Sequence, residues 1–535
     1  MKNFITFFLI FYSLIASCQI QDAWVYLIDK PNADFYLQNP LEMLSQRALN
    51  RRINQNIELD ISDVPVHQLY VDQINNTNGI DVLAKSKWMN AVHVRGEFEI
   101  LQNLTVLNFV AFIEYADKTL NTVPKPVPLQ LLASTKKTAQ SQNNFDYGNS
   151  ANQIEMLNGH LLHQEGFTGS GLVIAVLDNG FIGVDNTQPF QRLQTENLIL
   201  GGYNFVGRDE SFYTGGNHGT RVLSTLAGYV ENELIGTAPD AFYYLFITED
   251  NTSETPLEES LWVEAAELAD SLGVDILNTS LGYNNFDNPN YNYTYEDMNG
   301  TTTFISRGAN WAHSKGMICV TSAGNAGSGS WQYITAPADA QGSFTVGAIN
   351  FEGNYASFSS VGPTSDNRIK PDVMAQGVAT VNANQSGTLN VANGTSFSAP
   401  VMAGLVACLW EAFPDLTNEE LMQYIRESAN LYDNPTAQMG YGIPDLYQAY
   451  QTLKVEDLHQ NGFSLYPNPT SDFLYFYTND ALNGTIRLFD ISGKIILEKS
   501  IENNSNINVQ HLQNGIYFYQ ILLDNQIKTG KIIKR

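Results

Sequence analysis

The sequence predicts an α/β protein, with a doubly wound, mostly parallel sheet preceded by a small α+β unit and followed by a C-terminal β-sandwich. Three observations indicate this order. Residues 22–115 mix helical and alternating segments, residues 152–453 alternate apolar strands with helical segments, and residues 461–535 carry short alternating stretches between turn residues. A length of 535 residues also suggests three or four domains, at about 150 residues each.

The N-terminus begins like an export signal. An apolar run covers residues 4–16 behind a single lysine, and small residues follow it. The run is shorter than the about 20 residues that span a bilayer. We expect a signal peptide over residues 1–18 with a cut before Gln19; in a second interpretation, residues 14–18 form a lipobox and Cys18 becomes a lipidated N-terminus. We predict no later transmembrane segment, so the mature protein is expected to be soluble or lipid-anchored.

A small α+β unit is expected from residue 19 to residue 118. Its strands are predicted at 23–28, 90–96 and 109–115, and its helices at 44–53 and 97–104. Three prolines between residues 124 and 128 and a polar run follow it. Prolines and polar residues in this density predict a linker, over residues 119–145.

The central domain is expected over residues 146–455. Residues 172–177 form an uninterrupted apolar run, which is typical of a parallel strand buried on both faces. Further strands are predicted at 274–278 and 316–320, and helices at 257–272 and 398–413. About 300 residues bury about 75% of the unfolded chain's surface, so we expect one large core.

The C-terminal domain is expected over residues 460–535. Residues 473–477, 485–489 and 515–521 alternate apolar with polar side chains and are separated by turn residues. This spacing predicts a small β-sandwich.

Charge and cysteine content exclude several classes of function. Asp and Glu outnumber Lys and Arg by 55 to 28, and the formal net charge of −27 repels nucleic acid and anionic lipid, so neither is an expected partner. Behind the signal only Cys319 and Cys408 remain, both in apolar runs. Buried free thiols are favoured over a bridge, and neither residue has the exposed, electropositive surroundings of a catalytic cysteine.

Three short motifs in the central domain contain residue types that can act together in catalysis. Asp178 ends the strand at 172–177, His218 begins a helical stretch, and Ser396 stands where the last long helix opens. Alone, they are typical of a turn, a loop and a helix N-cap. Together they indicate nucleophilic catalysis, because a serine hydroxyl needs an imidazole to take its proton and the imidazole needs a carboxylate to fix its tautomer.

A fourth motif supplies a donor for a developing oxyanion. Asn325 follows the strand that ends at Val320, and its amide together with the backbone N–H of Ser396 would stabilise the negative charge of an acyl-transfer intermediate. The ordinary interpretation of Asn325 is a turn residue in left-handed backbone.

These motifs carry a family resemblance. The runs at 176–180, 217–220, 278–282, 321–325, 370–373 and 394–400 resemble, in order, spacing and flanks, those of the subtilisin-like serine protease (subtilase) family. The resemblance extends over about 300 residues of the chain. It implies a secreted serine endopeptidase that acts on protein or peptide substrates through an acyl-enzyme.

The resemblance implies a role for each residue. Asp178 would orient the imidazole, His218 would act as general base and then acid, Ser396 would be the nucleophile and Asn325 would stabilise the oxyanion. In the substrate groove, Ser280-Leu281-Gly282 would pair with the substrate backbone as an added strand. With Ser322, Ala323 and Gly324 that segment would wall the pocket for the residue before the scissile bond.

The chain departs from the family pattern without losing a catalytic group. Asn179 replaces the usual Ser or Thr, Arg221 and Ser224 stand where His and Gly are frequent, and Gln376 replaces a frequent Pro. Arg221 is expected to alter the pH profile or the substrate preference.

Residues 283–299 look like an insertion beside the groove. They are rich in Asn, Asp and Tyr, and a polar surface loop is favoured over a calcium site built from hard oxygens. No cofactor is expected for catalysis; structural calcium and any other metal site stay open.

The flanking units also resemble known domains. The N-terminal unit resembles the family's inhibitory propeptide, which implies a zymogen that cleaves itself between Asp117 and Asp146; the alternative is an unrelated structural domain. The tail, with motifs at 466–470, 488–494 and 515–517 and a basic end, resembles the C-terminal sorting domain of type IX secretion. That implies export across the outer membrane, with the secretion machinery as a partner, and weakens the lipoprotein interpretation of Cys18. A carbohydrate- or protein-binding sandwich is the alternative for the tail.

Two other functions remain as rivals. A sedolisin-type acid peptidase shares the fold and a Gly-Thr-Ser motif but uses Glu in place of His218, so the motif here argues against it. A surface adhesin on an inactive protease scaffold is opposed by the intact set of four catalytic residue types.

Overall fold

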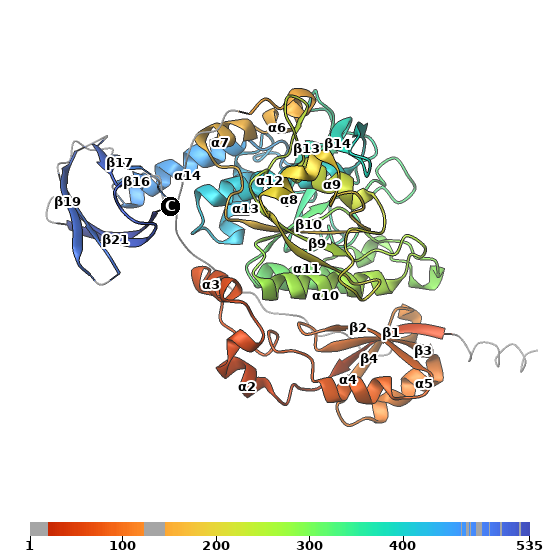
Figure 1. The fold of residues 1–535 in the computed structure, drawn as a ribbon. Helices are drawn as coiled ribbons and strands as arrows, with labels where there is room; N and C mark the ends of the chain where they lie inside the picture. Colours follow the sequence, from red (N-terminus) through yellow and green to blue (C-terminus); the bar gives the residue numbers. More distant parts are fainter. Residues whose placement is uncertain are drawn as a thin grey trace, which may run out of the picture.

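The computed structural model describes residues 20–121 and 145–461 and most of residues 463–534, with gaps at 467–469, 471, 478–483, 492, 503–504 and 524–525. The expected signal peptide with Cys18 and most of the expected linker therefore lie outside the described residues. Figure 1 shows three bodies, which we call the N-terminal unit (20–121), the central domain (145–461) and the C-terminal unit (463–534).

The N-terminal unit is a four-stranded antiparallel sheet with helices beside it. Its strand order is β2-β3-β1-β4, and its core contains Val25, Val92 and Leu101. The strands are β1 (Ile20–Leu27), β2 (Ile80–Ser86), β3 (Ala91–Glu97) and β4 (Val110–Tyr115), and the helices are α2 (Ala33–Gln38), α3 (Gln46–Asn54), α4 (Gln68–Asn75) and α5 (Phe98–Asn103). The three predicted strands and two predicted helices are confirmed, whereas β2, α2 and α4 were not predicted.

The central domain is built on a seven-stranded sheet in which every neighbouring pair is parallel. The strand order is β13-β12-β11-β10-β5-β9-β6. The strands are β5 (Val173–Asp178), β6 (Ile199–Asn204), β9 (Phe242–Ile247), β10 (Ile276–Thr279), β11 (Ile318–Ser322), β12 (Ser343–Ile349) and β13 (Val373–Gln376). The chain builds one side of the sheet from β5 and the other from β10, so the order reverses between these two strands, where open α/β sheets place their sites.

Helices cover both faces of this sheet, as the continuous apolar run of β5 requires. Ile174 and Val176 of β5 face the core that contains α9 (His218–Ala227) and α12 (Thr395–Ala412). The alternate residues Val173, Ala175 and Leu177 face α10 (Pro256–Leu272) and α11 (Phe304–Ser314). The doubly wound fold is therefore confirmed (Figure 1).

Smaller elements complete the central domain. They are α6 (Ala151–Glu155), α7 (Gly159–Glu165), α8 (Gln191–Thr195), β7 (Tyr229–Val230), β8 (Leu234–Ile235), β14 (Thr380–Ala383), β15 (Leu389–Ala392), α13 (Asn418–Glu427) and α14 (Leu446–Asn461). Among the described residues, α12 is the one helix long and apolar enough to cross a membrane, and 94% of it is buried in the fold, as expected for a central core helix.

The C-terminal unit is a sandwich of two antiparallel sheets, as predicted. One sheet holds β16 (Ser464–Tyr466), β17 (Phe473–Tyr477) and β20 (Ser505–Asn508); the other holds β18 (Gly484–Phe489), β19 (Ile495–Ile501), β21 (Gly515–Leu523) and β22 (Gln526–Lys534). Leu474 and Phe476 of the first sheet share a core with Ile486, Leu488 and Ile521 of the second.

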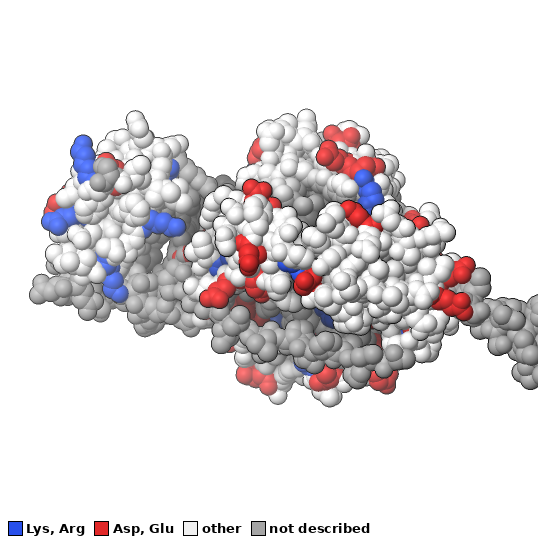
Figure 2. Space-filling model, turned by 90° about the horizontal axis from the view of Figure 1, so that it is seen from below, with Lys and Arg blue, Asp and Glu red and all other residues white. Residues whose placement is uncertain are grey.

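The negative charge is unevenly distributed. Residues 460–535 hold seven Lys or Arg and six Asp or Glu, so the net charge of −27 belongs to the rest of the chain. Figure 2 shows Lys and Arg on the C-terminal unit at the left, while Asp and Glu dominate the remainder of that face.

The N-terminal unit packs against α10 and α11 of the central domain (Figure 1). The Glu267 carboxylate of α10 accepts hydrogen bonds from the Ser86 hydroxyl at 2.6 Å and from the backbone N–H groups of Lys87 at 2.8 Å and Trp88 at 3.0 Å. The turn between β2 and β3 is thus held by one buried side chain of the central domain.

A buried ion cluster reinforces this contact. Arg51, Arg52 and Lys87 of the N-terminal unit all pair with the carboxylate of Asp270 on α10. Burial alone raises the pKa of Asp270, but Arg52, Lys87 and Arg51 outweigh it and hold the pKa well below its ordinary value. The carboxylate is therefore charged, and removing either side of the cluster leaves buried charge unpaired.

Candidate active site

The first candidate pair forms where β5 ends and α9 begins. Asp178, the last residue of β5, is buried, and its two carboxylate oxygens lie 2.8 and 3.0 Å from Nδ1 of His218, the first residue of α9. The backbone N–H of Asn179 donates to the same carboxylate at 2.8 Å. The carboxylate therefore fixes the proton on Nδ1 and leaves Nε2 of His218 as the basic nitrogen.

Local sequence explains this placement. The Asn179 side-chain oxygen accepts from the backbone N–H of His218 at 3.2 Å, which satisfies a free donor at the start of α9. A Cβ at position 219 would lie 2.5 Å from the Gly180 carbonyl and 2.9 Å from the Asp178 Cβ. Only glycine after His218 lets the helix approach β5 this closely. The unusual Asn179 thus takes part in positioning the imidazole.

Charges around His218 raise its pKa above the ordinary value. The main cause is the negative charge of Asp178, burial acts in the opposite direction, and the hydrogen bond to Asp178 adds to the increase. Glu249 also raises the pKa and Arg221 lowers it. Arg221 is thus electrostatically coupled to the imidazole, as expected from the sequence.

Ser396 is the second residue of α12, and its hydroxyl does not cap the helix. The N-cap residue is Gly394, and no side chain bonds there. The Ser396 hydroxyl donates to the Ser280 carbonyl at 3.1 Å, and the Ser280 hydroxyl donates to the Ser396 carbonyl at 3.0 Å. The N-cap interpretation of Ser396 is therefore wrong, and the hydroxyl stands at the carboxyl edge of the sheet beside β10.

His218 lies beside the start of α12 without a hydrogen bond to Ser396. The ring centroids of His218 and Phe397 are 6.0 Å apart. Within the described chain the Ser396 hydroxyl is bonded to the Ser280 carbonyl instead of the imidazole. Hydrogen bonds between a nucleophile and its base are often long or poorly aligned without substrate and tighten in the substrate complex.

Asn325 is held in one orientation by Thr395. Its side-chain oxygen accepts from the backbone N–H of Thr395 at 2.9 Å and from the Thr395 hydroxyl at 3.1 Å, which leaves the Nδ2 amide free to donate elsewhere. Asn325 does not have positive φ, so the turn interpretation of this residue is wrong. Thr395 was not singled out in the sequence, where it is part of the Gly-Thr-Ser motif.

Two donors converge beside Gly394. A Cβ placed on Gly394 would lie 3.8 Å from Nδ2 of Asn325 and 3.7 Å from the backbone nitrogen of Ser396. Both N–H groups are therefore within reach of a single oxygen atom in front of Gly394. The N-terminal end of α12 adds the positive end of a helix dipole at this point.

The two predicted substrate-binding segments lie on adjacent strands. Ser280-Leu281-Gly282 follows β10, and Ser322 ends β11 ahead of Ala323 and Gly324. The Ser322 hydroxyl donates to the Leu281 carbonyl at 3.4 Å, so the segments are joined side by side.

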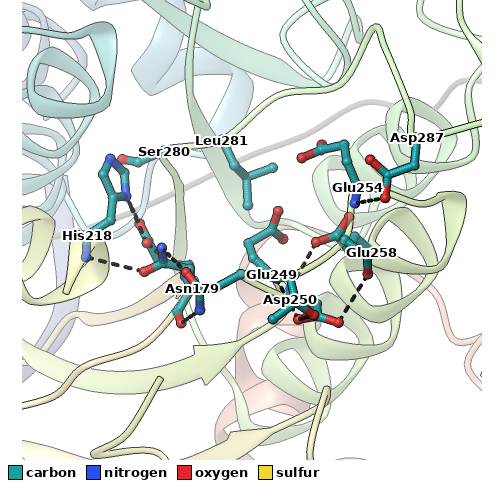
Figure 3. Close-up of a pocket in the computed structure, with 13 residues that line it drawn as sticks. Asn179, His218, Glu249, Asp250, Glu254, Glu258, Ser280, Leu281 and Asp287 are labelled. Atoms are coloured by element: carbon teal, nitrogen blue, oxygen red, sulfur yellow. Dashed lines mark hydrogen bonds and ion pairs between the residues drawn. The ribbon is translucent and has the colours of Figure 1, made fainter. Parts of the chain in front are cut away.

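A pocket of about 440 Å³ extends from the Asp178–His218 pair (Figure 3). His218 and Ser280 lie at one end of the view, and Glu254, Glu258 and Asp287 lie at the other. The lining residues are Asp178, Asn179, His218, Glu249, Asp250, Asn251, Thr252, Ser253, Glu254, Glu258, Ser280, Leu281 and Asp287. Neither Lys nor Arg is among them.

Burial weakens the acidity of two carboxyls in this pocket. It raises the pKa of Glu249 to about 7, with the charges of Glu254 and Asp178 adding to the shift. It raises the pKa of Glu258 to about 9, with the charge of Glu249 adding to it. Burial and the proximity of the two carboxyls therefore both oppose simultaneous ionisation of Glu249 and Glu258.

The loop at 283–299 lies between this pocket and the N-terminal unit. Asp287 lines the pocket, while the Asp297 carboxylate pairs with Lys118 and accepts from the Thr294 N–H at 2.7 Å. The Tyr291 hydroxyl accepts from the backbone N–H of Asp22 at 3.2 Å. In the part of the chain that the structure describes, no three His, Cys, Asp or Glu side chains are grouped as metal ligands.

The two cysteines are buried and unpaired with each other, as predicted. Burial raises the pKa of both the Cys319 and the Cys408 thiol, which leaves neither as a thiolate at neutral pH.

Comparison with known proteins agrees with this geometry. The subtilase family matches residues 169–442, the Bacteroidota peptidase S8 propeptide domain matches residues 22–135, and a secretion system C-terminal sorting domain matches residues 464–535. The propeptide and sorting-domain expectations are thereby confirmed.

The chain is similar to several curated subtilisins. It is 30% identical over 302 residues to subtilisin NAT of Bacillus subtilis subsp. natto, covering 56% of this chain and 70% of that protein. It is equally similar to a subtilisin of Bacillus pumilus, covering 56% of this chain and 98% of that one. A crystal structure of MycP1 from Mycobacterium smegmatis matches at 21% identity with a TM-score of 0.44, over 59% of this chain and 88% of that one. The chain belongs to the subtilase family, as a serine endopeptidase with a propeptide domain and a C-terminal secretion sorting domain.

Proposed function

We propose that this chain is a secreted endopeptidase that hydrolyses peptide bonds through an acyl-enzyme on Ser396 and is made as an autoprocessed zymogen. One observation carries the proposal. A carboxylate-held imidazole, His218, lies at the start of α12, where the amide of Asn325 and the backbone N–H of Ser396 converge on one point. This arrangement supports His218 as the general base, Ser396 as the nucleophile and the two N–H groups as the oxyanion donors.

The acylation step begins when the Ser396 hydroxyl turns from the Ser280 carbonyl to Nε2 of His218. Nε2 takes the hydroxyl proton as the oxygen forms a bond to the scissile carbonyl carbon, and Asp178 keeps its charge and stabilises the imidazolium. Asn325 Nδ2 and the Ser396 N–H hold the negative oxygen. The carbon–nitrogen bond then breaks, and the departing amine takes the proton from Nε2.

Deacylation follows the same steps, with water as the nucleophile. Water gives a proton to Nε2 of His218 and attacks the acyl carbon. The bond to Ser396 then breaks, the Ser396 oxygen takes the proton back from Nε2, and the acid is released. The substrate backbone pairs with Ser280-Leu281-Gly282, and Ser322, Ala323 and Gly324 complete the pocket for the residue before the scissile bond. No cofactor takes part in either step.

The contacts of the N-terminal unit support the proposal of zymogen processing. It is held on α10 and α11 by the Glu267 and Asp270 contacts, and Lys118 near its end pairs with Asp297 of the loop at 283–299. We propose self-cleavage between Asp117 and Asp146.

We propose the following division of the chain: a signal peptide at 1–18, the propeptide at 19–118, a processing region at 119–145, the peptidase domain at 146–455 and the sorting domain at 460–535. The sorting domain directs the protein to the cell surface or the medium, and the type IX machinery is the proposed partner. N-terminal analysis of the uncleaved Ser396→Ala protein separates a cut before Gln19 from lipidation at Cys18.

The mechanism is tested with Ser396→Ala and a matched control on the same helix. Ser398 is buried, and its hydroxyl donates to the Thr395 carbonyl at 3.0 Å, away from the proposed chemistry. Ser396→Ala should abolish both peptide hydrolysis and release of the N-terminal unit, while Ser398→Ala retains both. Undiminished hydrolysis by Ser396→Ala would contradict the mechanism and would favour a different catalytic centre.

A further inference from the structure

Asn251, on the loop between β9 and α10, is joined to the segment that follows Asp178. It lines the same pocket as Asn179, from which it is 72 residues away in the sequence. The Asn179 Nδ2 amide donates to the Asn251 side-chain oxygen at 2.9 Å, and the Asn251 Nδ2 amide donates to the Asn179 carbonyl at 3.3 Å. Two hydrogen bonds therefore connect the two asparagines.

Asn179 in turn contacts both members of the Asp178–His218 pair. Its backbone N–H donates to the Asp178 carboxylate at 2.8 Å, and its side-chain oxygen accepts from the backbone N–H of His218 at 3.2 Å (Figure 3). An asparagine amide carries an acceptor oxygen at one end and a donor NH2 group at the other. If the Asn179 amide turned over, its NH2 group would face the N–H of His218, and two donors would oppose each other.

Asn251 selects the orientation of the Asn179 amide. Its side-chain oxygen accepts from Nδ2 of Asn179, which leaves the Asn179 oxygen for the backbone of His218. The Asn179 carbonyl also accepts from the Gly216 N–H at 2.8 Å. A Cβ at position 216 would lie 2.4 Å from the Asn179 side-chain oxygen, so the side chain packs directly against the backbone of Gly216. Asn179 is thus fixed at both its backbone and its side chain.

The need for an orienting partner follows from the residue type at position 179. Ser or Thr, which is usual at this position, carries a hydroxyl that rotates to suit its neighbours. An amide has two unlike ends and needs a partner that distinguishes them. The departure from the family pattern at Asn179 therefore explains why an acceptor from a distant loop, Asn251, is bonded to it.

We propose that Asn251 is a positioning residue for His218, because it fixes the Asn179 amide and through it the start of α9. The inference rests on the proposed function, in which His218 is the general base. Asn251 is exposed and both asparagines line the pocket, so a substrate that covers them removes water from their hydrogen bonds and strengthens these bonds. Since the imidazole gains charge in the transition state, its misplacement raises the barrier more than it weakens substrate binding.

The test measures kcat and KM of the processed enzyme on one quenched fluorescent peptide that the wild type cleaves. Asn251→Ala should lower kcat about 2- to 12-fold, the effect of one neutral hydrogen bond, and leave KM unchanged. The matched control is Asn186→Ala, which removes an exposed asparagine that is bonded to its neighbour Asp185, and it should change neither constant.

The pH profile of kcat/KM separates positioning from general damage. The charge of Asp178 and the hydrogen bond to it raise the pKa of His218. When the imidazole is held less closely to Asp178, this pKa falls, and the acid limb of Asn251→Ala should move to lower pH. Glu249 and Arg221, which also act on His218, are unchanged in this variant.

A double-mutant cycle tests the route through Asn179. Asn179→Ser replaces the amide by a hydroxyl that orients itself, so Asn251→Ala should have no further effect on kcat in that background. Asn179→Ser should also recover most of the kcat lost in Asn251→Ala.

The outcomes distinguish this inference from the proposed function. A loss confined to KM, an acid limb that stays in place, or a full effect of Asn251→Ala in the Asn179→Ser background overturns the positioning role and leaves the proposed function standing. If Asn179→Ser fails to fold, the kinetic constants and the pH profile of Asn251→Ala still decide. Hydrolysis of the same peptide by Ser396→Ala at the wild-type rate overturns the proposed function, and this inference with it.

Discussion

Thr395 orients the Asn325 amide, and removing its hydroxyl perturbs the proposed oxyanion site without deleting a donor. The Asn325 side-chain oxygen accepts two hydrogen bonds from Thr395, from the backbone N–H at 2.9 Å and from the hydroxyl at 3.1 Å. Thr395→Val keeps the first and removes the second. The substitution also leaves the Gly324 N–H, which donates to that hydroxyl at 3.2 Å, without its partner.

The size of the effect follows from the number of bonds lost. A hydrogen bond between neutral groups contributes about 0.5–1.5 kcal/mol net. If that free energy sets the orientation of the amide, kcat falls about 2- to 12-fold, because 1.36 kcal/mol is tenfold in rate. Loss of the donor itself, in Asn325→Ala, should cost about 10²- to 10³-fold in kcat, the magnitude established for subtilisin, a member of this family.

Steady-state kinetics with a double-mutant cycle separate orientation from general damage. Thr395→Val should lower kcat and leave KM unchanged, because the amide acts on charge that develops in the transition state. Thr395→Ser restores the hydroxyl and should recover most of the activity. In an Asn325→Ala background Thr395→Val should have no further effect on kcat. A full effect of Thr395→Val in that background, or a loss confined to KM, would refute the orienting role.

Three further predictions use other parts of the structure. Arg221→Gln removes a charge that lowers the pKa of His218, so the acid limb of the kcat/KM profile should move to higher pH, while Arg221→Lys leaves it in place. Alkylating reagents should label Cys319 and Cys408 only after denaturation, because both thiols are buried and burial raises their pKa values. Detection of either label on the native protein by mass spectrometry would contradict this. Asp270→Asn should weaken docking of the N-terminal unit by about 3–5 kcal/mol, because it leaves Arg51, Arg52 and Lys87 without their shared carboxylate. In the uncleaved Ser396→Ala protein, the backbone amides of the N-terminal unit should then exchange faster with solvent deuterium. Unchanged exchange would contradict the role of the ion cluster.

Much of the fold was predictable because the pattern of apolar residues in each segment matches the faces that the structure buries. The apolar run at 172–177 had to be buried on both faces, and β5 is covered on both. The strand β2 was missed because Asp81 and Lys85 interrupt its apolar residues, and its burial depends on α10 of another domain. The predicted start of the helix at 398–413 was three residues late, since α12 begins at Thr395, directly after the Gly394 N-cap.

The candidate site likewise contains residues that the sequence suggested and residues that only the structure reveals. Asp178, His218, Asn325 and Ser396 were proposed from the sequence because their types and order would suffice for the chemistry. Their positioning partners were not, because they come from distant segments. Ser280 and Ser396 are 116 residues apart, and Asn325 and Thr395 are 70 apart.

Covalent labelling tests the central claim, that Ser396 is a nucleophile activated by His218, most directly. A fluorophosphonate reacts with an activated serine, forming a phosphorus–oxygen bond and releasing fluoride. Peptide mass spectrometry of the treated enzyme should find a single adduct on Ser396, and His218→Ala should abolish it. An adduct on a different residue, or labelling of Ser396 at an unchanged rate in His218→Ala, would contradict the account.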